Sequence, residues 1–421
     1  MAHSAEIIAV GTEILLGNIA NTDAQFLSRE LSALGIGVYW HTVVGDNPAR
    51  LRRALEAART RADIILTTGG LGPTYDDLTK QTICEVFHRP LELHPDIAEN
   101  LRTFYREALH QTMPDSNLQQ ARLPVGCTVF ANAVGTAPGC AFCEQDVHVL
   151  MLPGPPHECE DMFCRQAKPY LQALSSEIIV SHDIMTFGLG ESSVEALLHD
   201  RMVAMENPTL ATYAKLPAEV QLRATARASS AAEAESMLSP VVAQVRSVLG
   251  DFVYGVDVAD LADACFRLLR SKGLTFSTAE SCTGGLIAQK ITAIPGASAV
   301  YRGGVVSYWT CVKASALGVS QELLDRCGAV SEPTARAMAE GARRVTGAEL
   351  GVSVTGVAGP DCDERGNPVG RIFVALAAPD GTYCRHLELG PRRRDRIRGV
   401  CANHAFDMLR RYLTGLDPEA L

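Results

Sequence analysis

The chain has 421 residues, of which 47% are hydrophobic and 20% charged, so it has the composition of a globular protein and, at roughly 100–200 residues per domain, the length of two or three domains. Its formal net charge of −10 disfavours direct nucleic-acid binding, because proteins with that function usually present a basic surface. The first residues lack the basic and apolar parts of a secretory signal, and no segment approaches the ~20 apolar residues of a membrane helix, so we expect a cytoplasmic protein without a membrane partner.

The first ~170 residues alternate between short apolar runs and longer helical patterns. Strands that alternate with helices of about 10–15 residues indicate βαβ units and a mostly parallel sheet. We therefore predict an α/β domain over residues 1–170. Its first predicted elements are a strand at 6–10, a helix at 21–34, a strand at 37–44, a helix at 47–58 and a strand at 63–66.

Thirteen cysteines are scattered over the chain, and without a visible secretory signal we expect them to be free thiols. Cys140 and Cys143 form a C-x-x-C pair, with further His and Cys residues after it, and such a pattern can bind zinc. However, turn-forming residues on both sides predict a short strand through the pair, and residues three apart on a strand point to opposite faces. We therefore do not expect these two thiols to share a metal.

A second feature of this domain is the Thr- and Gly-rich segment 67–77, which follows the third strand. Hydroxyl and backbone N–H groups at a strand end suit a phosphate, and the end of the first strand would contribute to the same crevice. Asp76 and Asp77 could hold a divalent metal cation there; alternatively, they only favour the start of the following helix. The predicted nucleotide-binding residues are Gly11, Thr12, Glu13, Thr68, Gly69, Gly70, Gly72 and Thr74.

Residues 171–255 have a different pattern and few chemically reactive groups. They predict a small α+β module with a strand at 177–187, a helix at 192–201, a strand with alternating polarity at 219–228 and an Ala-rich helix at 231–249. We interpret this module as a spacer or a dimerisation element and expect a homodimer.

A third domain, again α/β, is predicted over residues 256–421, with a helix at 262–272, strands at 274–278, 303–308, 350–354 and 369–377, and a last helix at 395–414. Ser281 lies at a corner between a strand and the helix that 282–285 begins. Such a corner exposes the hydroxyl group and leaves backbone N–H groups free for a phosphate or an oxyanion. Glycines allow a ligand to approach closely, so Thr283, Gly284 and Gly285 are predicted to contact the substrate.

A serine hydroxyl is a weak nucleophile until a base removes its proton. Neither histidine of this domain, His386 or His404, has a suitable context, whereas Lys313 at the start of a helix could act as the base if a dry site lowers its pKa. Tyr308 could relay a proton or hold the lysine. The alternative is that Ser281 is a helix cap, Lys313 a surface charge and Tyr308 an aromatic at the edge of the core.

Two further segments support a site in this domain. Thr355 and Gly356 follow a buried-strand pattern, and open α/β sheets bind ligands at strand ends. The basic segment 392–398 begins the last helix. Most of its arginines would be solvated, but one of them could reach a substrate phosphate.

The whole chain resembles the CinA (competence/damage-inducible) family. In the C-terminal ~160 residues the matching motifs are 279–285, 303–308 with Lys313, 328–333, 355–360 and 368–370. The resemblance implies a three-layer α/β nicotinamide-nucleotide amidase that needs no cofactor, with Ser281 as nucleophile and Lys313 and Tyr308 as its activating groups. It also implies a substrate-holding arginine, which Arg394 matches best and Arg398 less well.

The N-terminal part is similar to the MoaB/MogA-like molybdopterin-binding fold, also of three layers, through the motifs 11–13, 44–47, 69–77, 135–139 and 152–156. In CinA proteins this resemblance implies a metal-dependent ADP-ribose pyrophosphatase that gives AMP and ribose 5-phosphate. Asp76 and Asp77 would lie near the metal. A ligand-binding or molybdopterin-related role stays open, because a fold does not determine a reaction.

One segment departs from the family pattern: Trp309–Lys313 replaces the usual Ser-Asn-Glu-Ala-Lys, which removes an asparagine that would contact the substrate. We predict an enzyme that hydrolyses the carboxamide of nicotinamide mononucleotide (NMN) and also cleaves ADP-ribose. Two alternatives stay open. In the first, the chain is an amidase whose N-terminal domain only binds a nucleotide. In the second, the chain is a non-catalytic partner protein in competence or recombination.

Overall fold

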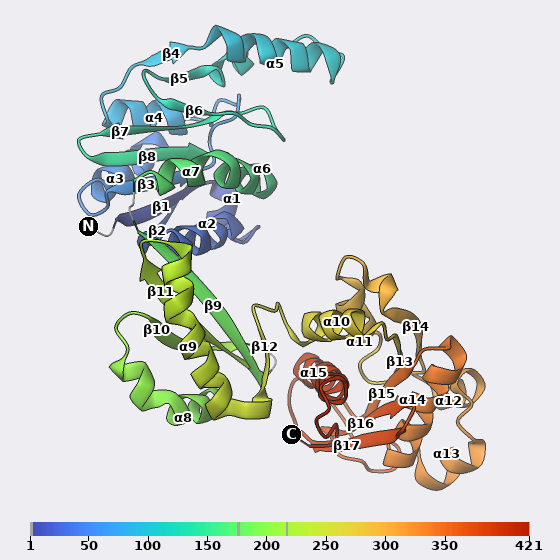
Figure 1. Cartoon of the computed structure of the whole chain (residues 1–421). Helices are drawn as coiled ribbons and strands as arrows, with labels where there is room; N and C mark the ends of the chain where they lie inside the picture. The colour runs from blue at the N-terminus through green and yellow to red at the C-terminus, as the bar shows by residue number, and fades with distance from the viewer. Residues whose placement is uncertain (1–2, 175–176, 216–217, 421) are drawn as a thin grey trace. The chain divides into compact units, whose positions relative to one another are not determined.

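The computed structural model describes residues 3–174, 177–215 and 218–420 (Figure 1). The chain divides into two compact units, one of residues 1–180 with 226–236 and the other of residues 181–225 with 237–421. Among the described helices, none combines the length and apolar character that crossing a membrane requires.

The first unit contains a six-stranded sheet in the order β2-β1-β3-β8-β7-β6. Neighbours from β2 to β8 pair in parallel, whereas β8, β7 and β6 pair antiparallel. The sheet is thus parallel in three of its five strand pairs, as predicted, and antiparallel at one edge, where short loops and not crossover helices connect the strands. The strands are β1 (Ser4–Val10), β2 (Gly37–Val44), β3 (Ile64–Thr68), β6 (Thr128–Phe130), β7 (Gly139–Glu144) and β8 (Val147–Leu152).

Helices cover both faces of this sheet. Ile7 of β1 packs in a cluster with residues of α2 and α6, while the next residue, Ile8, packs with α3 and α4, as the alternation of side chains along a strand requires. This confirms the three-layer α/β prediction. The other elements are α1 (Thr12–Leu15), α2 (Thr22–Ala33), α3 (Pro48–Ala58), α4 (Thr79–Val86), β4 (Leu91–Leu93), α5 (Pro95–Glu107), η1 (Asp115–Gln119), β5 (Arg122–Pro124), α6 (Pro156–Met162), η2 (Phe163–Ala167) and α7 (Lys168–Gln172).

The middle of the chain forms a four-stranded sheet in the order β10-β11-β9-β12, with α8 and α9. Its α+β character agrees with the sequence prediction, although the sequence did not indicate β10 and β12. The bounds are β9 (Ile178–Phe187), α8 (Glu191–Ala204), β10 (Thr209–Lys215), β11 (Glu219–Ala228), α9 (Ala231–Leu249), η3 (Gly250–Phe252) and β12 (Val253–Val256).

The C-terminal part contains a five-stranded sheet in the order β14-β13-β15-β16-β17, parallel from β14 to β15 and antiparallel beyond. The elements are α10 (Leu261–Lys272), β13 (Phe276–Glu280), α11 (Leu286–Thr292), η4 (Ala297–Ala299), β14 (Tyr301–Val306), α12 (Thr310–Leu317), α13 (Gln321–Cys327), α14 (Glu332–Thr346), β15 (Leu350–Gly356), β16 (Arg371–Ala378), β17 (Gly381–Glu388) and α15 (Arg394–Leu413).

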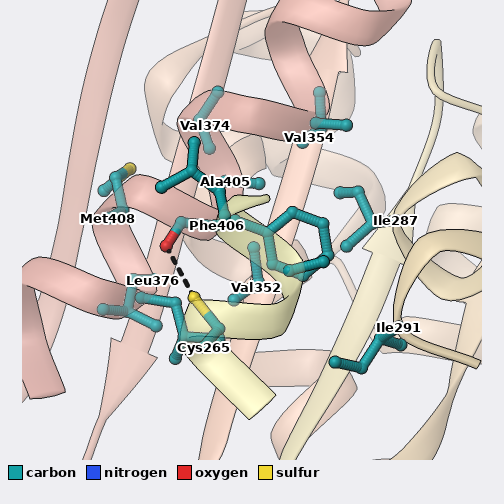
Figure 2. Packing of buried hydrophobic residues seen from close by; sticks show 14 of the residues in the cluster. Cys265, Ile287, Ile291, Val352, Val354, Val374, Leu376, Ala405, Phe406 and Met408 are labelled. Carbon is teal, nitrogen blue, oxygen red and sulfur yellow. Dashed lines mark hydrogen bonds between the residues drawn. The ribbon is translucent and has the colours of Figure 1, made fainter. Parts of the chain in front are cut away.

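Alternating residues of this second sheet again pack on two faces. Val374 of β16 lies in the large cluster with α10, α11 and α15, whereas Ala375 packs against α14. Figure 2 shows Phe406 of α15 in this large cluster, where its carbonyl oxygen accepts a hydrogen bond of 3.1 Å from the thiol of Cys265. The last helix is therefore fixed by the core, and its first turn extends to the strand ends where the site lies.

Candidate functional site

Ser281 is the first residue after β13, and its backbone N–H donates a hydrogen bond of 2.9 Å to the carbonyl of Val354 in the neighbouring strand. The next helix begins only at Leu286, because the chain turns through Gly284 and Gly285, which have φ values of 59° and 91°. Such left-handed conformations favour glycine. The predicted corner between strand and helix is present, and Gly284 and Gly285 adopt the left-handed backbone conformations that it requires.

The carboxylate of Glu280 takes up the N–H groups that were expected to face a ligand. This side chain is 1% exposed and accepts hydrogen bonds of 2.9, 3.1 and 2.9 Å from the backbone N–H groups of Gly285, Ile287 and Ala288. Gly284 donates to the carbonyl of Ser281. The prediction that Gly284 and Gly285 offer free N–H groups was therefore wrong, because an internal carboxylate already neutralises the start of α11.

Two backbone N–H groups at the corner, those of Cys282 and Thr283, have no acceptor among the described residues. Cys282 directly follows the candidate nucleophile, which is where the oxyanion hole of a nucleophile elbow contains its first N–H. Cys282 also lines the cavity, so its N–H can face an oxyanion there. Thr283 is fully buried and, like Gly284 and Gly285, does not belong to the described lining of the cavity.

Lys313 lies beside Ser281. Its Nζ atom is 3.1 Å from Ser281 Oγ and donates a second hydrogen bond of 2.5 Å to the carbonyl oxygen of Ser307. The lysine side chain is 1% exposed, and burial lowers its pKa from 10.5 to about 8. A neutral amine is accordingly accessible near physiological pH, at hydrogen-bond distance from the hydroxyl that it would deprotonate.

Tyr308 has a different partner from the one we expected. Its hydroxyl accepts a hydrogen bond of 2.7 Å from Arg394, whose guanidinium also donates to the carbonyl of Gly359 at 2.5 Å. Among the described residues, the tyrosine makes no hydrogen bond with Lys313, because the chain leaves β14 at Val306 and the carbonyl of Ser307 takes that place. Of the two roles considered for Tyr308, holding the lysine does not agree with these contacts, and relaying a proton stays a prediction.

A cavity of about 600 Å³ connects these groups. Of the predicted residues, it is lined by Ser281, Tyr308, Lys313, Thr355, Gly356 and Arg394. The sequence did not indicate the charged residues Asp325, Asp361, Asp363, Glu364 and Arg365, which also line it. The lining therefore combines two arginines with several carboxylates.

Arg398, the second candidate for a substrate arginine, has a structural contact. Its guanidinium donates hydrogen bonds of 3.2 and 2.6 Å to the carbonyl oxygen of Thr283 and is absent from the described cavity lining. Arg394, one turn earlier on α15, lines the cavity. The choice of Arg394 as the better candidate thus agrees with the geometry.

The residues predicted for the N-terminal site lie at or after the carboxyl ends of β1 and β3, which are neighbours in the sheet, and β8 is the next strand beside β3. A Cβ atom on Gly69 would lie 2.2 Å from the carbonyl of Val10, and one on Gly154 would lie 3.2 Å from Gly69 Cα, so three loops meet closely. Thr12 is bound to Asp46, with its hydroxyl 2.7 Å from a carboxylate oxygen. Position 69 is thus a glycine because the backbones of the neighbouring loops approach it closely.

Asp76 and Asp77 precede α4 by three and two residues, since that helix begins at Thr79, so they lie in the loop rather than in its first turn. Both carboxylates accept hydrogen bonds of 2.5 Å from the hydroxyl of Thr74. Gly72 is required beside them, because a Cβ there would lie 2.5 Å from an Asp77 oxygen. Two adjacent carboxylates fit a hard cation that takes its other ligands from phosphate and water.

The described residues contain no group of three or more His, Cys, Asp or Glu side chains arranged to hold a metal by themselves. Cys140 and Cys143 lie on β7, where the first is buried and the second exposed, as expected for residues that point to opposite faces. Across the described chain the cysteines are free thiols.

Lys80 is a buried residue of the N-terminal site that the sequence did not indicate. Its ammonium group donates to the carbonyls of Gln119 and Gln120 at 2.9 and 3.0 Å, and burial lowers its pKa to about 8. The side chain of Gln119 bonds to the carbonyl of Asp77. Lys80 is therefore connected to the aspartate loop through Gln119, the last residue of η1.

Three family models match the chain. They are "Probable molybdopterin binding domain" over residues 6–173, "Damage-inducible protein CinA KH domain" over 181–255 and "CinA C-terminal domain" over 258–413. A CinA-like protein from Gloeobacter violaceus is 46% identical over 98% of this chain and 97% of its own length. One from Kosmotoga olearia is 43% identical over 98% and 99%.

Solved structures match part of the chain. The competence/damage inducible protein CihA from Agrobacterium tumefaciens is 41% identical, covers 37% of this chain and 93% of its own, and has a TM-score of 0.35. The CinA protein of Thermoplasma acidophilum is 31% identical over 40% and 98%, with a TM-score of 0.37.

Proposed function

The chain belongs to the CinA family, and from this premise we propose that its C-terminal domain is an amidase in which Ser281 attacks the carboxamide of a nicotinamide nucleotide. The observation that supports this most strongly is the 3.1 Å distance between Lys313 Nζ and Ser281 Oγ. A buried lysine with a pKa of about 8 has the properties of a general base rather than of a surface charge.

The proposed reaction is acyl transfer. Neutral Lys313 takes the proton of Ser281 while the serine oxygen forms a bond to the amide carbon, and the N–H group of Cys282 stabilises the oxyanion. The C–N bond then breaks, and Lys313 returns the proton to the departing ammonia. Water attacks the acyl-enzyme by the reverse proton transfers and releases the carboxylate. These steps require only protein groups.

The charges of the cavity favour NMN as substrate. NMN combines a cationic pyridinium ring with an anionic phosphate, and the cavity lining contains both Arg394 and the acidic residues Asp361 and Glu364. Arg394 can bind the phosphate by charge-assisted hydrogen bonds. Because its guanidinium also bonds to Tyr308, the tyrosine would position the substrate arginine rather than carry a proton.

The test is ammonia release from NMN by the wild-type protein and by Ser281→Ala. Removal of a serine nucleophile should lower the rate at least about a thousandfold. Ser277→Ala is a matched control, because Ser277 is a buried serine of β13 whose hydroxyl, among the described residues, donates its hydrogen bond to the carbonyl of Leu350. Equal rates for wild type and Ser281→Ala would end the proposal.

For the N-terminal domain we propose a metal-dependent pyrophosphatase that cleaves ADP-ribose to AMP and ribose 5-phosphate. Asp76 and Asp77 would hold a divalent cation, which would neutralise the pyrophosphate charge and polarise the bond that breaks. The glycine loops at the ends of β1, β3 and β8 would accept the nucleotide. The observation in favour is the pair of carboxylates on Thr74, close to these loops.

A further inference from the structure

The segment that connects β15 to β16 contributes several residues to the lining of the cavity, and part of this segment is ordered by its own contacts. The carboxylate of Asp363 accepts hydrogen bonds from the backbone N–H groups of Arg365 and Asn367 at 3.0 and 2.8 Å. It also accepts one from the Asn367 amide at 2.7 Å. Residues 361–367, here named the acidic loop, therefore form a small folded turn.

Arg365 attaches this loop to α13, which also contributes residues to the cavity lining. Its guanidinium donates hydrogen bonds of 3.1, 2.6 and 3.2 Å to the carbonyl oxygens of Leu324, Asp325 and Arg326, in the last turn of α13. Carbonyls at a helix C-terminus lack partners within the helix and carry the negative end of its dipole. A planar cation with five donors suits them well.

Gly328 makes this contact possible. A Cβ atom at this position would lie 2.9 Å from Arg365 Cδ, and the residue has a φ of 84°. The aliphatic part of Arg365 thus passes directly over a residue without a side chain. The contact is specific to this pair, since any other residue at 328 would displace the arginine.

From these contacts we propose that Arg365 is a positioning residue for substrate binding, which holds the acidic loop against α13 and so fixes the width of the cavity. Residues of both elements that it joins line the cavity, namely Leu324 and Asp325 on α13 and Asp361 and Glu364 on the loop. The inference rests on the proposed amidase function. Arg365 contacts neither Ser281 nor Lys313 among the described residues, so it should affect binding and not chemistry.

The kinetic test compares Arg365→Ala with the wild-type protein on NMN. Loss of charge-assisted hydrogen bonds should raise KM about tenfold, while kcat stays within about twofold. Arg365→Lys, which retains the charge but reaches fewer carbonyls, should have an intermediate KM. Arg326→Ala is the matched control, because it removes an exposed arginine side chain from the same helix turn and keeps the carbonyl, and its kinetics should not change. An unchanged KM in Arg365→Ala would overturn the proposal.

A second measurement does not depend on amidase activity. In hydrogen–deuterium exchange of the full chain, backbone amides of the acidic loop should exchange faster in Arg365→Ala than in the wild type. Amides of α14 should exchange equally in both. Unchanged exchange of the loop would overturn the role of Arg365 even if NMN were not the substrate, whereas faster exchange without any ammonia release would refute only the proposed function.

Discussion

At the scale of the single residue, Lys313 has the property on which the proposed chemistry depends. Its ammonium group has two recorded hydrogen-bond acceptors, Ser281 Oγ and the Ser307 carbonyl, and no carboxylate forms an ion pair with it among the described residues. A buried cation without an ion-pair partner is costly, and the protein reduces this cost by a lower pKa. The burial that suits Lys313 to the proposed role as a base therefore lowers the stability of the folded protein.

This loss of stability predicts the effect of Lys313→Met. Methionine fills similar space without a charge, so the variant should lose ammonia release but unfold at the same or a higher temperature than the wild type at pH 7. The folded-state pKa of about 8 lies below the ordinary 10.5, so the cost is full below pH 8 and decreases as pH rises toward 10.5.

Thermal unfolding at pH 7 and at pH 10 measures this directly. The gain of Lys313→Met over the wild type should be smaller at pH 10, where the unfolded state also begins to lose the proton. A clear loss of stability in the variant at pH 7 would instead indicate that the lysine contributes favourable contacts.

At the scale of the element, the strand-to-helix corner depends on Glu280. The sequence predicted the strand over 274–278, whereas β13 runs to Glu280. A charged residue normally marks the end of a buried strand, but this carboxylate is satisfied by three N–H groups of α11 and is therefore buried. The alternation of strands and helices could be predicted from local sequence patterns, and the pairing of Ser281 with Lys313 from the family motifs. The contact between β13 and α11 through Glu280 could not.

Contacts between elements that lie far apart in the sequence also explain the other wrong predictions. Tyr308 was expected within a strand beside the lysine, but β14 ends at Val306, and the partner of the tyrosine comes from α15, which is 86 residues further along the chain. The acidic part of the cavity lining joins α13 to a loop some 40 residues later. Pairings over such distances depend on the tertiary fold, which periodicity and spacing do not report.

Glu280→Gln tests the importance of the corner. The glutamine amide has one acceptor oxygen, and its NH₂ group would face backbone N–H groups of α11 that need an acceptor. The thermal midpoint should therefore fall by a few degrees, equivalent to about 1–3 kcal/mol in the free energy of unfolding, and kcat should decrease. Glu349→Gln is the control, because Glu349 also accepts a backbone N–H, from Thr275, but outside the cavity. It should lower the midpoint without a change in kcat; an equal loss of kcat in both variants would argue against a positioning role for Glu280.

At the scale of the whole molecule, the two proposed sites belong to separate compact units, each built on its own sheet. Their chemistries differ as well, since one uses a serine and a lysine and the other a pair of aspartates. The two activities should therefore be lost independently. The homodimer expected from the middle of the chain stays a prediction, which sedimentation equilibrium can test.

Asp77→Ala and chelation by EDTA should both abolish AMP formation from ADP-ribose and leave ammonia release from NMN unchanged. Ser281→Ala should do the reverse. Asp161→Ala, which removes an aspartate paired with Arg165 on α6, is the matched control and should retain both activities. AMP formation that persists in EDTA, or in Asp77→Ala, would refute the metal-dependent proposal.

The central claim is that a neutral lysine amine removes the proton of Ser281, and the pH dependence of kcat/KM for NMN tests it most directly. This parameter reports the ionisation of the free enzyme. Since only deprotonated Lys313 can act as base, kcat/KM should rise with pH and level off above an apparent pKa of about 8. A profile that is flat through this range, or that rises only near 10.5 as for an exposed lysine, would contradict the account.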